Sequence, residues 1–535
     1  MHLSWWQTGI IYEVYARSLQ DSDGDGMGDL RGITRRLDHF VWLGVNAIWI
    51  TPVFPSPMTD SGYDVADYCG IDPLFGALDD FDKLVREAHA RGLKIILDYV
   101  PNHTSDQHPW FLESRRSRAS RTRNWYLWRD AGPEGGPPNN WLSNFNGSAW
   151  TWDAGSRQYY YHSFLPTQPD LNWRHPELRS AMHDVLRFWL RRGVDGFRVD
   201  VMWMMIKDDQ YRDNPPNPDW RPGAPSHDRL LPLYTSDRPE VHEVVAGLRA
   251  VLGEFEDRVL IGEIYLPVDR LVAYYGAGLR GAQLPFNFQL LLLEGWSAVS
   301  LARTINTYMA ALPPGGSPSW VLGNHDRSRV ATRVGSAQAR IAAMLLLTLR
   351  GTPTIYMGDE LGMLDTPIPP GQLRDPAELR EPGRGLGRDP ERTPFPWHDG
   401  PGAGFTEGTP WLPVGRDVSL QTQRESRSSM VSFYRRLIQL RHTLPALRTG
   451  SMTQAIAEGG VLSYRRGTAE DTLLVTLNTT DTASRPVAVN GRVLASTNSA
   501  RESTLVKGYL ILDPNEGVIV AVDNTGRLPA DERPN

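Results

Sequence analysis

Residues 193–201 read GVDGFRVDV, a short apolar run interrupted by charged residues. Successive side chains of a β-strand point to opposite faces, so Arg198 and Asp200 share one face. Charged groups inside an apolar strand are costly unless they are paired or used. The stretch therefore indicates a buried strand that carries functional groups toward its end.

Runs of the same kind recur along the chain, with longer amphipathic stretches between them. Strands that alternate with helices imply parallel strands joined by helical crossovers. Eight such strands predict an α/β fold, a (β/α)₈ TIM barrel, with an open doubly wound sheet as the alternative. The predicted strands are Ile10–Ala16, Asn46–Val53, Leu93–Val100, Gly196–Val201, Val259–Tyr265, Gln283–Asn287, Trp320–His325 and Thr352–Gly358, and the clearest helices are Asp80–Ala90, Pro176–Arg191, Glu240–Leu252, Ser297–Ala311, Ala337–Leu349 and Ser429–Leu444.

Two intervals interrupt this alternation. Residues 104–173 are polar and rich in Trp, and they predict a domain inserted after the third strand. Residues 361–427 are rich in Gly, Pro and Arg, and they predict an irregular excursion after the eighth strand. The barrel domain would then comprise 1–103 and 174–450. Over 451–535 strand-like pieces without helices predict an all-β sandwich: Val461–Arg465, Thr472–Leu477, Arg485–Val489, Tyr509–Leu512 and Gly517–Val522.

Composition limits the classes of function. Of the 535 residues, 22% are charged and 40% hydrophobic, which is typical of a globular chain. The net charge of −6 and the scattered basic residues argue against a nucleic-acid partner. The single cysteine, Cys69, excludes an internal disulfide framework. No signal-peptide pattern or membrane span of roughly 20 apolar residues is present. We therefore expect a cytoplasmic protein without a membrane partner, and leave monomer or homodimer open.

Acidic residues recur at the ends of four predicted strands. In a parallel barrel all strands open their carboxyl ends on one face, so these groups would converge there. Glycoside hydrolysis needs such a set, because one carboxylic acid protonates the leaving oxygen while a second carboxylate attacks or activates water. A lone acid would more simply be a buried ion pair, but four strand ends favour catalysis. The motifs are KIILDYVPNH with Asp98 and His103, GVDGFRVDV, RVLIGEIY with Glu263, and WVLGNHDRSR with His325 and Asp326.

Taken in order, DYVPNH, GFRVDV, IGEI and GNHD resemble the four signature regions of the α-amylase superfamily (glycoside hydrolase family 13). QPDLNW at 168–173 resembles its fifth region, and GTPTIYMGDE at 351–360 resembles its last strand. The resemblance implies that Asp200 is the nucleophile of a covalent glucosyl-enzyme and that Glu263 is the general acid, then the base. Asp326 would be the third acid, which grips the hydroxyls of the sugar.

The resemblance also implies roles for the residues around these acids. Arg198 would orient Asp200 and keep it ionised through charge-assisted hydrogen bonds. His103 and His325 would hydrogen-bond the same glucose, whereas Asp98 would have a structural role. Phe164, just before the fifth region, is a further candidate for the pocket.

Two other stretches are similar to the oligosaccharide-acting members of the superfamily, which include α-glucosidases, oligo-1,6-glucosidases, sucrose isomerases and trehalose synthases. They are SGYDVADY at 61–68 and GRDPERTPFPW at 387–397. The resemblance implies that Asp60 and Tyr63 close the glucose pocket, with the tyrosine as a stacking platform. Arg388 would pair with Asp60 and bind the non-reducing-end hydroxyls. The alternative for Tyr63 is an ordinary aromatic residue of a loop, and the alternative for Arg388 is an arginine on the surface. A blocked end implies an exo-acting α-glucosidase for short substrates.

Val201 directly follows the predicted nucleophile, and valine at this position is similar to that in members that act on α-1,6 linkages. We therefore lean to isomaltose-type substrates and leave α-1,4 linkages open. The following MWMMIKD departs from the usual family continuation. A glucosyltransferase or an isomerase on the same scaffold therefore stays the alternative. A non-catalytic relative should lack one of the three acids, and Asp200, Glu263 and Asp326 are all present.

DSDGDGMGDL at 21–30 places acidic residues at alternate positions among glycines. Hard oxygen ligands of this kind suit Ca²⁺ or Mg²⁺, and Gly32 at loop position twelve excludes an EF-hand. The family resemblance implies a structural calcium site, with a solvated acidic turn as the alternative. No strand precedes the glycines of GRGLGRD, so we expect no nucleotide or other organic cofactor. The predicted ligands are Asp21, Asp23, Asp25, Asp29 and the backbone carbonyl of Met27.

Overall fold

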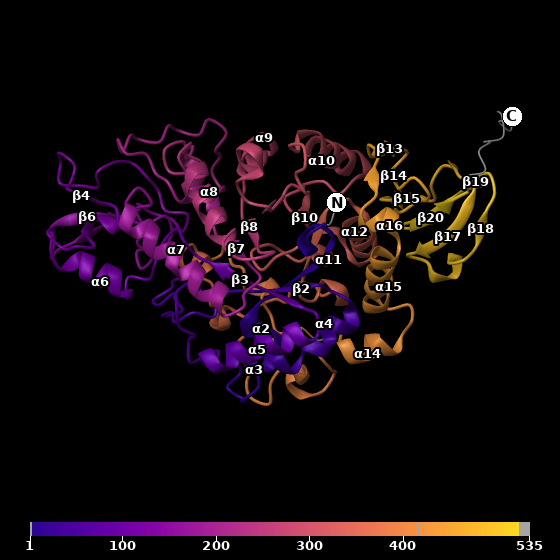
Figure 1. The fold of residues 1–535 in the computed structure, drawn as a ribbon, viewed down its shortest axis with the longest axis horizontal. Coiled ribbons are helices and arrows are strands. Elements are labelled where there is room, and N and C mark those ends of the chain that lie inside the picture. The colour runs from indigo at the N-terminus through magenta and orange to yellow at the C-terminus, as the bar shows by residue number, and fades with distance from the viewer. Residues whose placement is uncertain (1–2, 416, 524–535) are drawn as a thin grey trace.

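The computed structural model describes residues 3–415 and 417–523, with an eight-stranded parallel sheet at its centre (Figure 1). The strand order is β10-β11-β1-β2-β3-β7-β8-β9. From β1 to β9, each strand of this sheet lies beside the preceding one. The last two strands, β10 and β11, lie on the other side of β1, so the sheet curves round into a barrel. The predicted TIM barrel is therefore confirmed, and the doubly wound alternative is wrong. The strands are β1 (Ile11–Val14), β2 (Ala47–Ile50), β3 (Lys94–Tyr99), β7 (Gly196–Val199), β8 (Val259–Gly262), β9 (Leu284–Pro285), β10 (Ser319–Val321) and β11 (Thr352–Tyr356).

Helices follow the barrel strands and cover their outer faces. The six helices predicted most clearly from the sequence correspond to α5, α7, α8, α10, α12 and α15. Among the described residues, no helix combines the length and apolarity needed to cross a membrane. The α-helices are α1 (Trp5–Thr8), α2 (Ala16–Leu19), α3 (Leu30–Arg35), α4 (Leu37–Leu43), α5 (Leu78–Ala90), α6 (Pro109–Arg116), α7 (Pro176–Arg191), α8 (Val241–Leu252), α9 (Val268–Leu271), α10 (Ala298–Ala311), α11 (Val330–Val334), α12 (Ser336–Thr348), α13 (Pro376–Arg380), α14 (Leu420–Glu425), α15 (Met430–Thr443) and α16 (Pro445–Arg448).

The interior of the barrel changes from apolar to charged along the strands. Its apolar layer includes Ile11, Ala47, Ile96, Val259, Ile261 and Val321. Two residues further along their strands, Ile11 is followed by Glu13 and Ile96 by Asp98, and side chains two apart share a face. Both carboxyl groups are at most 1% exposed. The barrel therefore buries ionisable groups at the carboxyl ends of its strands.

Two long segments extend from this end of the barrel. The segment after β3 carries α6 and a three-stranded antiparallel sheet, which lies at one end of the molecule in Figure 1. Its strands are β4 (Trp128–Arg129), β5 (Trp150–Asp153) and β6 (Gln158–Tyr161). Between residues 362 and 419 the described chain forms only α13 and short 3₁₀ turns.

The C-terminal region is a two-sheet antiparallel sandwich at the opposite end of the molecule, as predicted (Figure 1). Apolar residues of both sheets, such as Val520 and Leu510, form one cluster. Strand β17 was not predicted from the sequence, because a β-bulge between Val493 and Ala495 breaks the alternation of buried and exposed residues that identifies a strand. The larger sheet contains β12 (Ser451–Met452), β13 (Ile456–Glu458), β14 (Val461–Gly467), β15 (Thr472–Asn478), β17 (Gly491–Ser496), β18 (Leu505–Val506) and β20 (Gly517–Val522), and the smaller contains β16 (Val487–Ala488) and β19 (Tyr509–Leu510).

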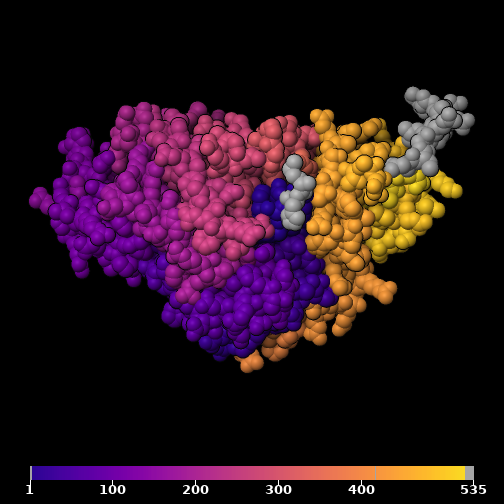
Figure 2. Space-filling view, in the orientation of Figure 1, coloured from indigo at the N-terminus to yellow at the C-terminus, as the bar shows by residue number. Residues whose placement is uncertain are grey.

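Figure 2 shows the sandwich packed against the last part of the barrel chain. Arg466 on β14 is fully buried there and donates to four backbone carbonyls, those of Thr348 (2.5 Å), Leu447 (2.9 Å), Gly450 (3.0 Å) and the less buried Ser451 (3.2 Å). Burial lowers the pKa of Arg466 to about 10. This side chain therefore ties the sandwich to the ends of α12 and α16.

We predict that Arg466→Met lowers the free energy of unfolding by about 3 kcal/mol, because three buried carbonyls lose their donor. Arg465→Met is the matched control, since Arg465 on the same strand is exposed. Melting temperatures of both variants measure the difference. Equal melting temperatures would show that these hydrogen bonds do not stabilise the junction.

Candidate active site

Arg198 on β7 lies among three carboxylates at the centre of the barrel. Its NH1 donates to Asp98 Oδ1 (2.9 Å) and to Asp200 Oδ1 (2.8 Å), and its NH2 forms an ion pair with Glu263 Oε2 (2.9 Å). Asp98 belongs to β3, Asp200 directly follows β7, and Glu263 directly follows β8. These three strands are neighbours in the parallel sheet, so their carboxyl ends lie side by side. One buried guanidinium thus gathers two of the three predicted catalytic acids, Asp200 and Glu263.

The excess of negative charge around Arg198 affects every ionisable group there. Burial, followed by the charge of Glu263, raises the pKa of Asp200 well above its ordinary value, and Arg198 opposes this rise. Burial also raises the pKa of Glu263. Burial alone would lower the pKa of Arg198, but the surrounding carboxylates raise it well above its usual range. Because these carboxyl groups share one guanidinium, the titrations of Asp200 and Glu263 depend on each other.

The backbone of Val201 orients Glu263. Val201 has φ +36° and ψ 46°, in the left-handed region that β-branched residues rarely adopt. In this conformation its N–H donates to Glu263 Oε2 at 2.8 Å. Such backbone strain costs roughly 1–3 kcal/mol and persists where the surroundings impose it. The residue that follows the predicted nucleophile thus also positions the predicted acid.

Asp326 accepts from two arginines of the excursion after β11. Its Oδ1 lies 2.7 Å from Arg392 NH2 and 3.1 Å from Arg388 NH1. Burial alone would raise the pKa of Asp326, but the adjacent His325 and the guanidinium groups of Arg388 and Arg392 hold that pKa well below its usual range. Asp326 is therefore a permanent carboxylate, and its side chain remains 20% exposed.

Arg388 also connects Asp326 with Asp60, in the loop after β2. Its NH2 lies 2.9 Å from Asp60 Oδ1, and its Nε lies 2.6 Å from Asp375 Oδ2. Gln168 donates to Asp60 Oδ2 at 3.0 Å. Burial raises the pKa of Asp60 to about 6, against the opposing charge of Arg388. Three distant chain segments thus meet at one guanidinium.

The predicted aromatic and histidine residues lie beside these acids. The Tyr63 ring stacks on His325 (5.5 Å between centroids, 14° between planes), and its hydroxyl donates to Asp98 Oδ2 at 3.0 Å. Phe164 is half-buried, with its ring 5.2 Å from that of His103. Burial lowers the pKa of His103 to about 4 and that of His325 well below its ordinary value. Both imidazoles are therefore neutral.

Sequence reasoning missed four members of this cluster: Glu13, Gln168, Asp375 and Arg392. Glu13 carried a usable signal, because it interrupts an apolar strand as Asp98 does. Gln168 and Arg392 stand inside motifs that were recognised, but no local pattern marks their contacts. Asp375 lies in irregular chain, where spacing does not predict which side chains meet.

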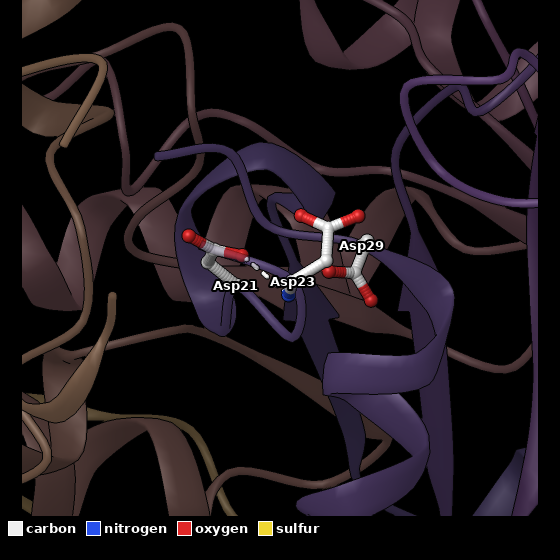
Figure 3. Close-up of side chains that lie close together, drawn as sticks. All are labelled: Asp21, Asp23 and Asp29. Atoms are coloured by element: carbon white, nitrogen blue, oxygen red, sulfur yellow. Dashed lines mark hydrogen bonds between the residues drawn. The ribbon is translucent and has the colours of Figure 1, made fainter. Parts of the chain in front are cut away.

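The acidic loop at 21–30 brings together only part of its predicted ligand set (Figure 3). Carboxylate oxygens of Asp21, Asp23 and Asp29 all lie within 4.8 Å of one another. Asp25 is not part of that carboxylate cluster, and its Oδ1 accepts the N–H of Met27 at 2.8 Å. Burial raises the pKa of Asp29, and the nearby charge of Asp23 adds to the rise. Three hard oxygen donors with unneutralised charge fit a divalent cation.

The sequence matches the family described as alpha amylase, catalytic domain, over residues 13–450. A probable alpha-glucosidase of Rhizobium meliloti (strain 1021) is 39% identical over 496 residues, which cover 90% of each chain.

Solved structures agree. An alpha-glucosyl transfer enzyme, XgtA, aligns with a TM-score of 0.92 and 37% identity, over 98% of this chain and all of that one. The trehalulose synthase MutB from Pseudomonas mesoacidophila MX-45 aligns with a TM-score of 0.89 and 32% identity over the same shares of the chains. The protein therefore belongs to the alpha-amylase family of glycoside hydrolases.

Proposed function

We propose that the protein is a retaining, exo-acting α-glucosidase that removes glucose from the non-reducing end of short α-glucosides. The observation that carries the proposal is the ion pair between Arg388 and Asp60 (2.9 Å), with Asp326 on the same guanidinium. A clamp of this kind closes one side of the pocket around the terminal sugar. Asp60 and Arg388 then offer acceptors and donors to its outer hydroxyls, which an internal residue of a polymer could not present.

The reaction runs through two displacements at the anomeric carbon. Asp200 attacks this carbon, and the departing glycosidic oxygen takes the proton of Glu263. Glu263, now a carboxylate, removes a proton from water, whose oxygen displaces Asp200. Each displacement inverts the carbon, so the product keeps its α configuration.

The geometry around Arg198 supports these assignments. Asp200 and Glu263 both contact this guanidinium, which favours the short separation, about 5–5.5 Å, of retaining enzymes. The raised pKa of Glu263 suits a group that begins the reaction protonated. Arg198 opposes the rise in the pKa of Asp200 and so favours the ionised form that the nucleophile requires.

Linkage preference rests on Val201, and we propose α-1,6 bonds as the preferred substrates. Hydrolysis is not the only outcome open to a covalent glucosyl-enzyme, because a sugar hydroxyl can replace water as the acceptor. A glucosyltransferase or isomerase is therefore the second candidate, favoured by the likeness to XgtA and to the trehalulose synthase.

Product analysis with maltose, isomaltose and trehalose, each supplied alone, tests the proposal. We expect free glucose from the first two, released fastest from isomaltose. Asp200→Asn should lower the rate by about 10⁴-fold or more, because no covalent intermediate can form. Chromatography over time measures both effects.

Asp209→Asn is the control, since Asp209 is an exposed acid nearby that takes no part in the cluster. Full activity of Asp200→Asn would contradict the mechanism. New disaccharides with little free glucose would keep the mechanism but assign the protein to the transferases or isomerases.

We also propose that the acidic loop binds a structural Ca²⁺, with Mg²⁺ as the alternative ion. Asp21, Asp23 and Asp29 would supply carboxylate oxygens. The ion would neutralise the loop and hold it against the excursion, where Thr406 donates to Asp21 Oδ2 at 2.5 Å.

Removal of the ion by EDTA should therefore lower the melting temperature, and added Ca²⁺ should restore it. Asp23→Asn should abolish this response, because Asp23 is an exposed ligand whose carboxylate accepts only a long contact, 3.4 Å from Asp25 N–H, within the described loop. Calorimetry of both proteins with and without each ion makes the measurement. An unchanged response in Asp23→Asn would contradict the assignment of the site.

A further inference from the structure

Glu13 is a buried carboxyl group at the centre of the barrel that the mechanism above does not use. It lies on β1 and is fully buried. Its Oε1 is 2.5 Å from Nδ1 of His325, whereas its Oε2 has no hydrogen-bond partner among the described residues. Tyr356 of β11 and Trp49 of β2 are its neighbours in register. The close side-chain contact of Glu13 is thus with a histidine of the sugar pocket.

The contacts of Nε2, the second ring nitrogen of His325, show which of the two nitrogens carries the proton. Nε2 lies 2.8 Å from the hydroxyl oxygen of Tyr63 and 3.4 Å from Asp326 Oδ2. Tyr63 has a single proton, which it donates to Asp98 Oδ2. Asp326 is a carboxylate and can only accept. Both neighbours therefore require a proton on Nε2.

A neutral imidazole that carries its proton on Nε2 has a bare Nδ1, which needs a donor. Glu13 is the group in position to donate, and it can do so only in its protonated form. Burial raises the pKa of Glu13 well above its ordinary value, which favours that form. Its unpartnered Oε2 is then a neutral carbonyl oxygen, for which a missing partner costs less than for a charged one.

We propose that Glu13 is a positioning residue that donates a proton to Nδ1 of His325 and thereby holds Nε2–H toward the glucose and Asp326. The inference rests on the proposed function for its catalytic consequence, but the tautomer itself does not depend on any substrate. With the other tautomer, Nε2 would turn a lone pair toward Asp326, and Tyr63 would have to withdraw its proton from Asp98. The hydrogen bonds that orient Arg198 would change in turn.

Two variants of nearly equal volume separate the explanations. The side-chain amide of the Glu13→Gln variant can donate an N–H to Nδ1 and leave its oxygen in place of Oε2, whereas Glu13→Met offers no donor. We expect Glu13→Gln to keep kcat/KM within about threefold. Glu13→Met should lose on the order of 10- to 100-fold, the range for residues that orient a functional histidine. Melting temperatures establish that both variants fold.

Equal activity of the two variants would show that position 13 only fills space, and equal loss would show that a negative charge is required; either result overturns the proposal. Nitrogen-15 NMR of imidazole-labelled protein, with His325→Gln to assign the signal, reads the tautomer without substrate. A protonated Nε2 with a bare Nδ1 is expected in the wild type and in Glu13→Gln. A proton on Nδ1 in the wild type would overturn the inference, even if glucosidase activity is found. If His325 carries its proton on Nε2 but the protein has no glucosidase activity, the proposed function is wrong and the role of Glu13 stands.

Discussion

The contact of Arg198 with three buried carboxylates is the interaction on which the rest of the site depends. A single positive charge cannot neutralise Asp98, Asp200 and Glu263 together, so the barrel holds excess negative charge in a largely buried place. Burial, together with the nearby charges of Asp326 and Asp98, raises the pKa of Glu263, which suits its proposed role as proton donor. The same guanidinium fixes Asp200 beside it. The proposed acid and the proposed nucleophile therefore depend on one electrostatic arrangement, which neighbouring parallel strands impose.

A second arginine, Arg388, holds another group of acidic residues together, as Arg198 does for the acids at the centre of the barrel. Arg388 joins Asp60, Asp326 and Asp375, which come from the loop after β2, the loop after β10 and the long excursion. The irregular excursion can hold these acids in place because the side chain of Arg388 within it is fixed by three ion pairs. In the proposed mechanism, Arg198 influences the protonation of the reacting groups, and Arg388 limits which end of a sugar chain can enter.

The barrel was predictable because its signals are local: apolar runs mark the strands, and charged residues at their ends mark one face. The predicted catalytic acids do lie together at the carboxyl ends of β7, β8 and β10. The left-handed backbone of Val201 was not predictable, because nothing in its side chain calls for that conformation. The contacts of Asp375 and Gln168 join segments far apart in sequence, and a bulge hid β17. Glu13 had the same signal as Asp98, an acid within an apolar strand, but it stands outside the signature motifs.

In the proposed mechanism, Asp200 and Glu263 act in two successive displacements. The configuration of the first glucose released tests it directly, because two inversions restore the original configuration and one does not. Proton NMR of the anomeric signals, recorded in the first minutes with 4-nitrophenyl α-D-glucoside, follows this product before mutarotation mixes the anomers. We predict that α-glucose appears first. Initial release of β-glucose would contradict it, since water would then attack in a single step.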